Sequence, residues 1–114
     1  MSLKLSSQTR YREVNNLLNE RDMVDVGRLI LLLKAIISYL KNDGSGEGSY
    51  AYLRKAINIL ENKSINGMAN INMYVMSDLR MMFDRGQYGD DIDIITNEVT
   101  SIIKKNPLFD KEKS

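Results

Sequence analysis

The side chains best suited to chemistry in this chain are three neighbouring carboxylates, Asp84, Asp90 and Asp91. Carboxylate oxygens are the ligands that Mg²⁺ prefers, so one interpretation is a magnesium site for phosphoryl chemistry. A carboxylate pair can also cleave glycosidic bonds, but one partner then needs an apolar pocket that raises its pKa. No apolar pocket is indicated around these residues. We rank the metal interpretation last and expect neither catalytic residues nor a bound metal.

Composition removes most other enzyme chemistry. The 114 residues include no cysteine and no histidine, which excludes disulfides, thiolate nucleophiles, the common zinc sites and Ser-His or Cys-His pairs. Sixteen basic side chains against fifteen acidic ones leave a net charge of +1. Such a balance gives no bulk attraction to nucleic acid or to an anionic membrane. We therefore expect a non-enzymatic protein with no cofactor.

A glycine-rich stretch over residues 43–49 resembles two kinds of ligand loop. It lacks the lysine of a Walker loop, and a helix is predicted where a dinucleotide fold needs a strand. Asp43, Ser45 and Glu47 match the start of a calcium loop, but Arg54 stands where a bidentate glutamate is required. The stretch is therefore interpreted as a flexible linker, with Ser49 capping the next helix.

Residues 78–98 carry the sharpest charge asymmetry, six acidic side chains against two basic ones. Two interpretations stay open: acids at a helix start interact favourably with its dipole, or they attract a basic partner. Ile94, expected opposite the core face, and Tyr88, expected in a turn, would supply apolar anchors. The candidate partner-binding set is Asp84, Tyr88, Asp90, Asp91, Asp93, Ile94 and Glu98.

Apolar residues at helical spacing predict an all-α fold, a single compact bundle of about five helices. The expected helices cover residues 7–20, 22–42, 50–62, 68–85 and 90–105 of one domain, 1–114, with loosely ordered tails over about 1–6 and 108–114. The second has the widest apolar arc and should be the central one. Ser7 is the expected N-cap of the first helix, and Gly86 should end the fourth in a left-handed conformation.

The expected core faces of the last two helices follow from the same spacing. They comprise Met68, Ile71, Val75, Leu79, Met82 and Phe83 in the fourth, and Ile92, Ile95, Val99, Ile102 and Ile103 in the fifth. Met73 and Met81 fall off the fourth helix's core face. That helix is either packed between neighbours on both sides or offers an adaptable contact surface, and we expect the first.

No export signal and no apolar run long enough for a membrane span is present, so the expected location is the cytoplasm, without membrane binding. Basic residues are scattered, and nucleic acid is not an expected ligand. The alternative function is a small helical DNA-binding regulator, with a homodimer formed through the fourth helix as one arrangement.

The chain resembles the small immunity proteins of bacterial contact-dependent growth inhibition and related polymorphic toxin systems. The likeness lies in its length, helicity, Ile and Asn content and acidic patch, and locally in residues 78–86, Asp-Leu-Arg-Met-Met-Phe-Asp-Arg-Gly. The resemblance implies a protein that binds its cognate toxin, often a basic nuclease, and covers the active site. It assigns no binding residue by position.

Overall fold

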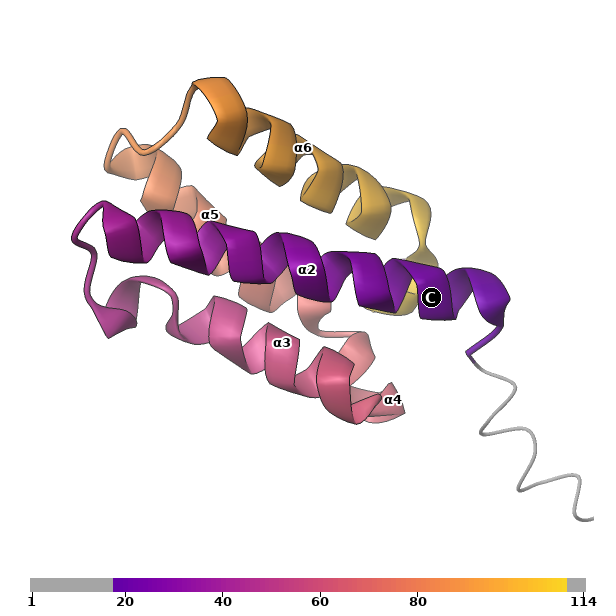
Figure 1. The fold of residues 1–114 in the computed structure, drawn as a ribbon. Coiled ribbons are helices and arrows are strands. Elements are labelled where there is room, and N and C mark those ends of the chain that lie inside the picture. The colour runs from indigo at the N-terminus through magenta and orange to yellow at the C-terminus, as the bar shows by residue number, and fades with distance from the viewer. Residues whose placement is uncertain (1–17, 111–114) are drawn as a thin grey trace, which may run out of the picture.

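A computed structural model of the chain describes residues 18–110, and there it is all-α, as predicted (Figure 1). The helices are α2 (Glu20–Asn42), α3 (Ala51–Asn62), α4 (Ile65–Met68), α5 (Ile71–Asp84) and α6 (Asp90–Lys105). Two single 3-10 turns, Glu47–Ser49 and Pro107–Phe109, complete the described part, which contains no strand. The helix predicted over 7–20 and the cap Ser7 lie almost entirely outside these residues.

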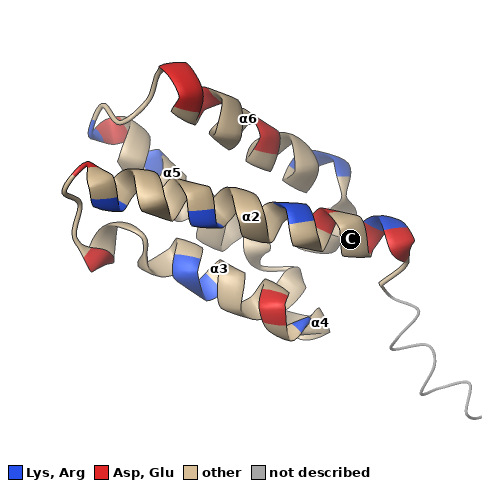
Figure 2. Cartoon of the chain, in the orientation of Figure 1, with Lys and Arg blue, Asp and Glu red and all other residues tan. Residues whose placement is uncertain are grey.

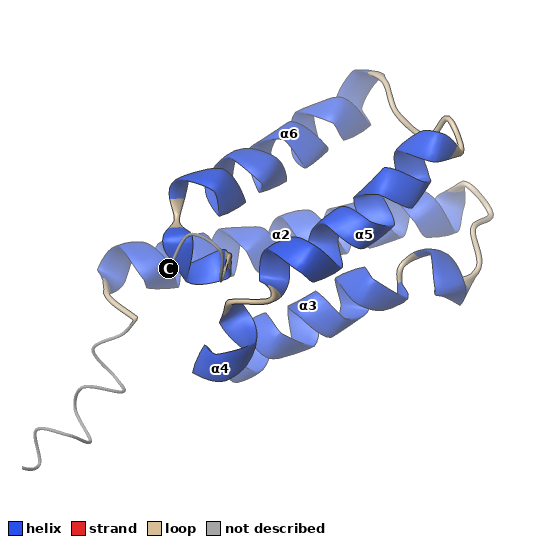
Figure 3. Ribbon diagram, turned by 180° about the vertical axis from the view of Figure 1, so that it is seen from behind, coloured by secondary structure: helices blue, strands red, loops and turns tan. Residues whose placement is uncertain are grey.

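The central helix is α2, as its apolar arc predicts. It lies between α6 on one side and α3 on the other, and α5 crosses behind it (Figures 1 and 3). Its arc is buried against these neighbours: Val26, Leu29, Leu32, Leu33, Ile36, Ile37 and Leu40. An arc this wide is what one helix needs to contact several others at once.

The start of α2 is set by a capping box. Asn19 Oδ1 accepts from the Asp22 amide at 2.8 Å, and Asp22 Oδ2 accepts from the Asn19 amide at 3.3 Å. This reciprocal pair satisfies two backbone donors that a helix start leaves free. The helix therefore begins at Glu20, two residues before the predicted boundary.

The far end of α6 is tied to the start of α2 by Asn106. Its buried side-chain amide donates to Asp22 Oδ1 at 3.0 Å and to Asp25 Oδ2 at 2.9 Å. The two helices therefore run antiparallel. Just beyond, Phe109 is completely buried, so the prediction of a loosely ordered tail from 108 is wrong for the described residues of that tail.

Helix α3 is capped from α5. The buried Asp78 carboxylate accepts the Leu53 amide at 2.9 Å and is also hydrogen-bonded to the Tyr52 amide. These are the second and third residues of α3, whose amides have no partner inside the helix. Ser49, the predicted cap, instead belongs to the 3-10 turn and makes no side-chain cap.

The turn between α3 and α5 contains the unpredicted helix α4. Gly67 lies so close to α3 that a Cβ there would meet Ile59 Cγ2 at 3.0 Å. At the other end, Gly86 adopts φ +80° after α5, confirming the predicted left-handed stop. Sequence spacing located both chain reversals, but it could not show that the first would contain a short helix.

The outward face of α5 differs from the prediction. Phe83, expected in the core, is 37% exposed, and Met73 and Met81 are about half exposed. Helix α5 is therefore not covered on both sides by the described residues. Its core face is otherwise as predicted, since Ile71, Val75 and further core positions are buried.

The glycine-rich loop is held by the turn after α5. Gln87 Nε2 donates to Asp43 Oδ2 at 2.7 Å and to Ser45 Oγ at 3.0 Å, and Gln87 accepts from Arg85 Nε at 2.9 Å. The two bonds donated by Gln87 join segments more than forty residues apart. The linker interpretation is thus incomplete, because the start of this loop is a tertiary contact.

Among the described residues, no helix has the length and apolar character needed to cross a membrane.

Replacing Asp78 by alanine should destabilise the protein by about 1–3 kcal/mol, because two amides at the start of α3 would be buried without acceptors. Asp78→Asn keeps a carbonyl oxygen at the same place and should cost clearly less. Urea unfolding followed by circular dichroism measures both. Equal losses in the two variants would contradict the capping role.

Burial raises the pKa of Asp78 above its ordinary value, against the lowering effect of the Leu53 and Tyr52 amides. Between the unfolded pKa of about 3.9 and the raised folded pKa, the folded chain holds a proton that the unfolded chain has released. The stability of the wild type relative to Asp78→Asn should therefore fall as pH rises through this window. Urea unfolding of both proteins over a pH series tests the sign, and a rising difference would refute it.

Candidate functional site

The predicted partner-binding residues lie at one end of the bundle and along one side of α6. Asp84 ends α5, Tyr88 lies in the following turn, and Asp90 and Asp91 begin α6. Figure 2 shows acidic residues gathered at that start of α6. Tyr88 and Ile94 are 62% and 67% exposed, as expected of contact residues.

Two acids of the set already have partners within the chain. Asp93 Oδ1 accepts from the Gly89 amide at 2.8 Å, which stabilises the start of α6. Glu98 forms a bidentate pair with Arg28 of α2, with Nε to Oε2 at 2.6 Å and Nη2 to Oε1 at 2.9 Å. Asp78, counted in the acidic stretch, is buried under α3. The acids still exposed and available to a partner are Asp84, Asp90 and Asp91.

The Arg28–Glu98 pair lies at the centre of a patch that the sequence does not reveal. Val24 and Leu31 lie one turn before and after Arg28, and Ile94 lies one turn before Glu98. Residues three or four apart share a helix face, so all three side chains border the ion pair. They are 69%, 63% and 67% exposed. We call Val24, Arg28, Leu31, Ile94 and Glu98 the α2–α6 face.

Electrostatics keep the centre of this face charged. The hydrogen bonds from Arg28 lower the pKa of Glu98, and the same bonds raise the pKa of Arg28. Asp91 continues the line of Ile94 and Glu98 toward the start of α6, because it lies three residues before Ile94. The face thus combines exposed aliphatic side chains, a fixed ion pair and an acidic edge, which suits protein recognition better than bond-making.

Ile94, Glu98 and the acids came from sequence reasoning, whereas Val24, Arg28 and Leu31 did not. Val24 and Leu31 could have been noticed because both fall outside the apolar arc of the second helix. Their association with Ile94 could not, since it depends on an ion pair between residues seventy positions apart.

The carboxylates do not assemble a metal site in the described part of the chain. No group of three or more acidic side chains there is placed to hold an ion. Asp43, the first residue of the calcium-like stretch, accepts from Gln87 instead. The magnesium interpretation of Asp84, Asp90 and Asp91 therefore gains no support from geometry.

Comparison with known protein families, with curated proteins and with solved structures finds no match to this chain.

The structure separates two acids that the sequence treats alike. Asp93→Ala should destabilise the protein by about 0.5–2 kcal/mol, because the Gly89 amide at the start of α6 loses its acceptor. Asp91→Ala removes only an exposed charge near the helix dipole and should cost about 0.3–1 kcal/mol. Thermal unfolding by circular dichroism compares them, and a larger loss in the Asp91 variant would contradict this assignment.

Proposed function

We propose that this chain is a non-enzymatic immunity protein that binds a cognate toxin domain through the α2–α6 face and its acidic edge. The observation that carries the proposal is the gathering of Val24, Leu31 and Ile94 around the Arg28–Glu98 pair. Aliphatic anchors around a fixed polar centre are typical of the surfaces that proteins bury on association.

Charge supports the choice of partner. Asp90 and Asp91 are exposed beside the face and place two negative charges at the start of α6. A basic surface would be attracted to it and oriented during encounter, whereas an acidic one would be repelled. The toxins implied by the resemblance include basic nucleases, so a basic toxin domain acting in the cytoplasm fits both the chemistry and the family likeness.

The test uses the polypeptide encoded immediately upstream of this chain's reading frame as the toxin. Expression of its C-terminal domain should stop growth, and co-expression of this chain should restore it. Ile94→Asp and Leu31→Asp should abolish the rescue, because each puts a carboxylate into the centre of a buried interface. Asp91→Lys should weaken binding and make the remaining affinity less sensitive to salt.

Met73→Asp is the matched control, since Met73 is an exposed apolar residue on α5, outside the α2–α6 face. It should leave growth rescue intact. Rescue by every variant would remove this face from the interface, and failure of the wild-type chain to rescue would overturn the immunity function. Purified chain that instead shifts DNA with a steep salt dependence would favour the regulator alternative.

A further inference from the structure

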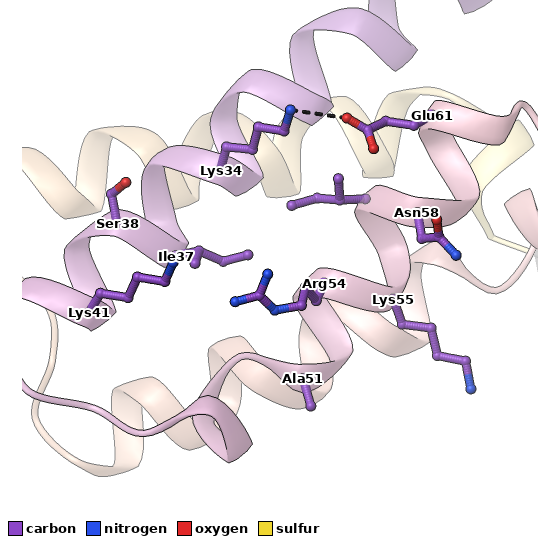
Figure 4. Close-up of a pocket in the computed structure, with 10 residues that line it drawn as sticks. Lys34, Ile37, Ser38, Lys41, Ala51, Arg54, Lys55, Asn58 and Glu61 are labelled. Carbon is purple, nitrogen blue, oxygen red and sulfur yellow. Dashed lines mark ion pairs between the residues drawn. The ribbon is translucent and has the colours of Figure 1, made fainter.

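A second surface lies on the opposite margin of α2. An open groove of about 660 Å³ separates α2 from α3 (Figure 4). Its floor includes Ile37 and Ile57, both nearly buried, while Lys34 and Lys41 line the α2 side and Arg54 and Glu61 line the α3 side. The proposed toxin-binding face uses none of these residues.

Charge is unevenly distributed along the groove. At one end Lys34 Nζ pairs with Glu61 Oε2 at 3.0 Å, which neutralises both. At the other end Lys41 and Arg54 reach toward one another from opposite helices (Figure 4). Both lie against the Tyr50 ring, at 5.9 and 5.2 Å from its centroid, and among the described residues neither pairs with a carboxylate. Two cations converge here without a counter-charge.

Convergent cations of this kind are stabilised by an anion placed between them. The guanidinium offers a planar pair of donors that fits a carboxylate or phosphate, and the ammonium adds a compact charge. The Tyr50 ring is nearly buried, which fixes the point from which both cations extend. This end of the groove is therefore preorganised for one negatively charged group.

The rest of the groove decides what carries that charge. No aromatic residue lines the groove, and the nearby Tyr50 ring is too buried for base stacking, so single-stranded nucleic acid lacks its usual platform. The Ile37 and Ile57 floor instead suits aliphatic side chains. The lining extends over about 10 Å of α2 and about 15 Å of α3, the length of two to three helical turns.

We propose that this groove binds an acidic amphipathic segment of a partner protein, with one of its carboxylates held between Lys41 and Arg54. The aliphatic side chains of the segment pack on Ile37 and Ile57, as in other helix-in-groove complexes. The orientation of the segment along the groove follows from the charges, because its acidic end is attracted to Lys41 and Arg54 and not to the neutral Lys34–Glu61 pair.

The probe is a short fluorescent peptide in which Glu and Leu repeat at helical spacing, titrated with the full chain and followed by anisotropy. Saturable binding is expected, and the same peptide with Gln in place of Glu should bind much more weakly. Raising the salt from about 0.1 to about 1 M shortens the Debye length from about 10 to about 3 Å and should also weaken binding.

Lys41→Glu and Arg54→Glu should each reduce affinity about tenfold or more, because each replaces attraction by repulsion where the carboxylate of the segment is expected to bind. Arg80→Glu is the matched control, since Arg80 is an exposed position on α5 and does not line the groove. Circular dichroism confirms that all three variants are folded.

Three results would overturn the proposal: no saturable binding of the Glu-Leu peptide, equal weakening by Arg80→Glu, or a preference for another anion. For the last, inorganic phosphate and oligothymidylate are titrated in parallel. If either binds more tightly than the peptide, and this binding is lost in the Lys41 and Arg54 variants, the site between these two residues is a phosphate site. Growth rescue against the upstream toxin is measured separately, so the immunity function and the peptide-binding groove can each fail without the other.

Discussion

Helix α2 buries its apolar arc against α3 on one side and α6 on the other, and the remaining architecture is arranged around this double contact. Removing apolar surface from water is worth roughly 25 cal/mol per Å², so an arc of seven buried aliphatic residues strongly favours neighbours on both sides. Polar contacts then fix the register. Asn106 ties α6 to the start of α2, and Asp78 holds the start of α3.

Both candidate surfaces lie at the margins of this contact, where residues of two helices meet but are not fully covered. On the α6 margin, the Arg28–Glu98 pair joins the helices and leaves aliphatic side chains exposed around it. On the α3 margin, Lys34 and Glu61 join the helices, and two turns away Lys41 and Arg54 have no carboxylate partner among the described residues. The near-neutral chain thus has two margins of different chemistry.

Asp78 shows how a charged residue can be read wrongly from sequence. It belongs to a stretch rich in acids, and composition places it on an acidic surface. In the structure it is buried, and its carboxylate caps the start of α3, which has no side-chain cap of its own. Phe83 shows the reverse error, because helical spacing assigns it to the core while its position near the end of α5 leaves it partly exposed. Spacing gives the face of a helix but not how far a neighbour extends along it.

The sequence by itself determined the helical class, the central place of α2, the chain reversal at Gly86 and the exposure of Tyr88 and Ile94. These properties follow from local spacing and from backbone preferences of a few adjacent residues. Only the tertiary structure decided which acids remain free, which aliphatic residues join Ile94, and that Lys41 and Arg54 converge. The reason is physical: each depends on contacts between helices distant in the chain, and their register is set by packing and by hydrogen bonds such as those of Asp78 and Asn106.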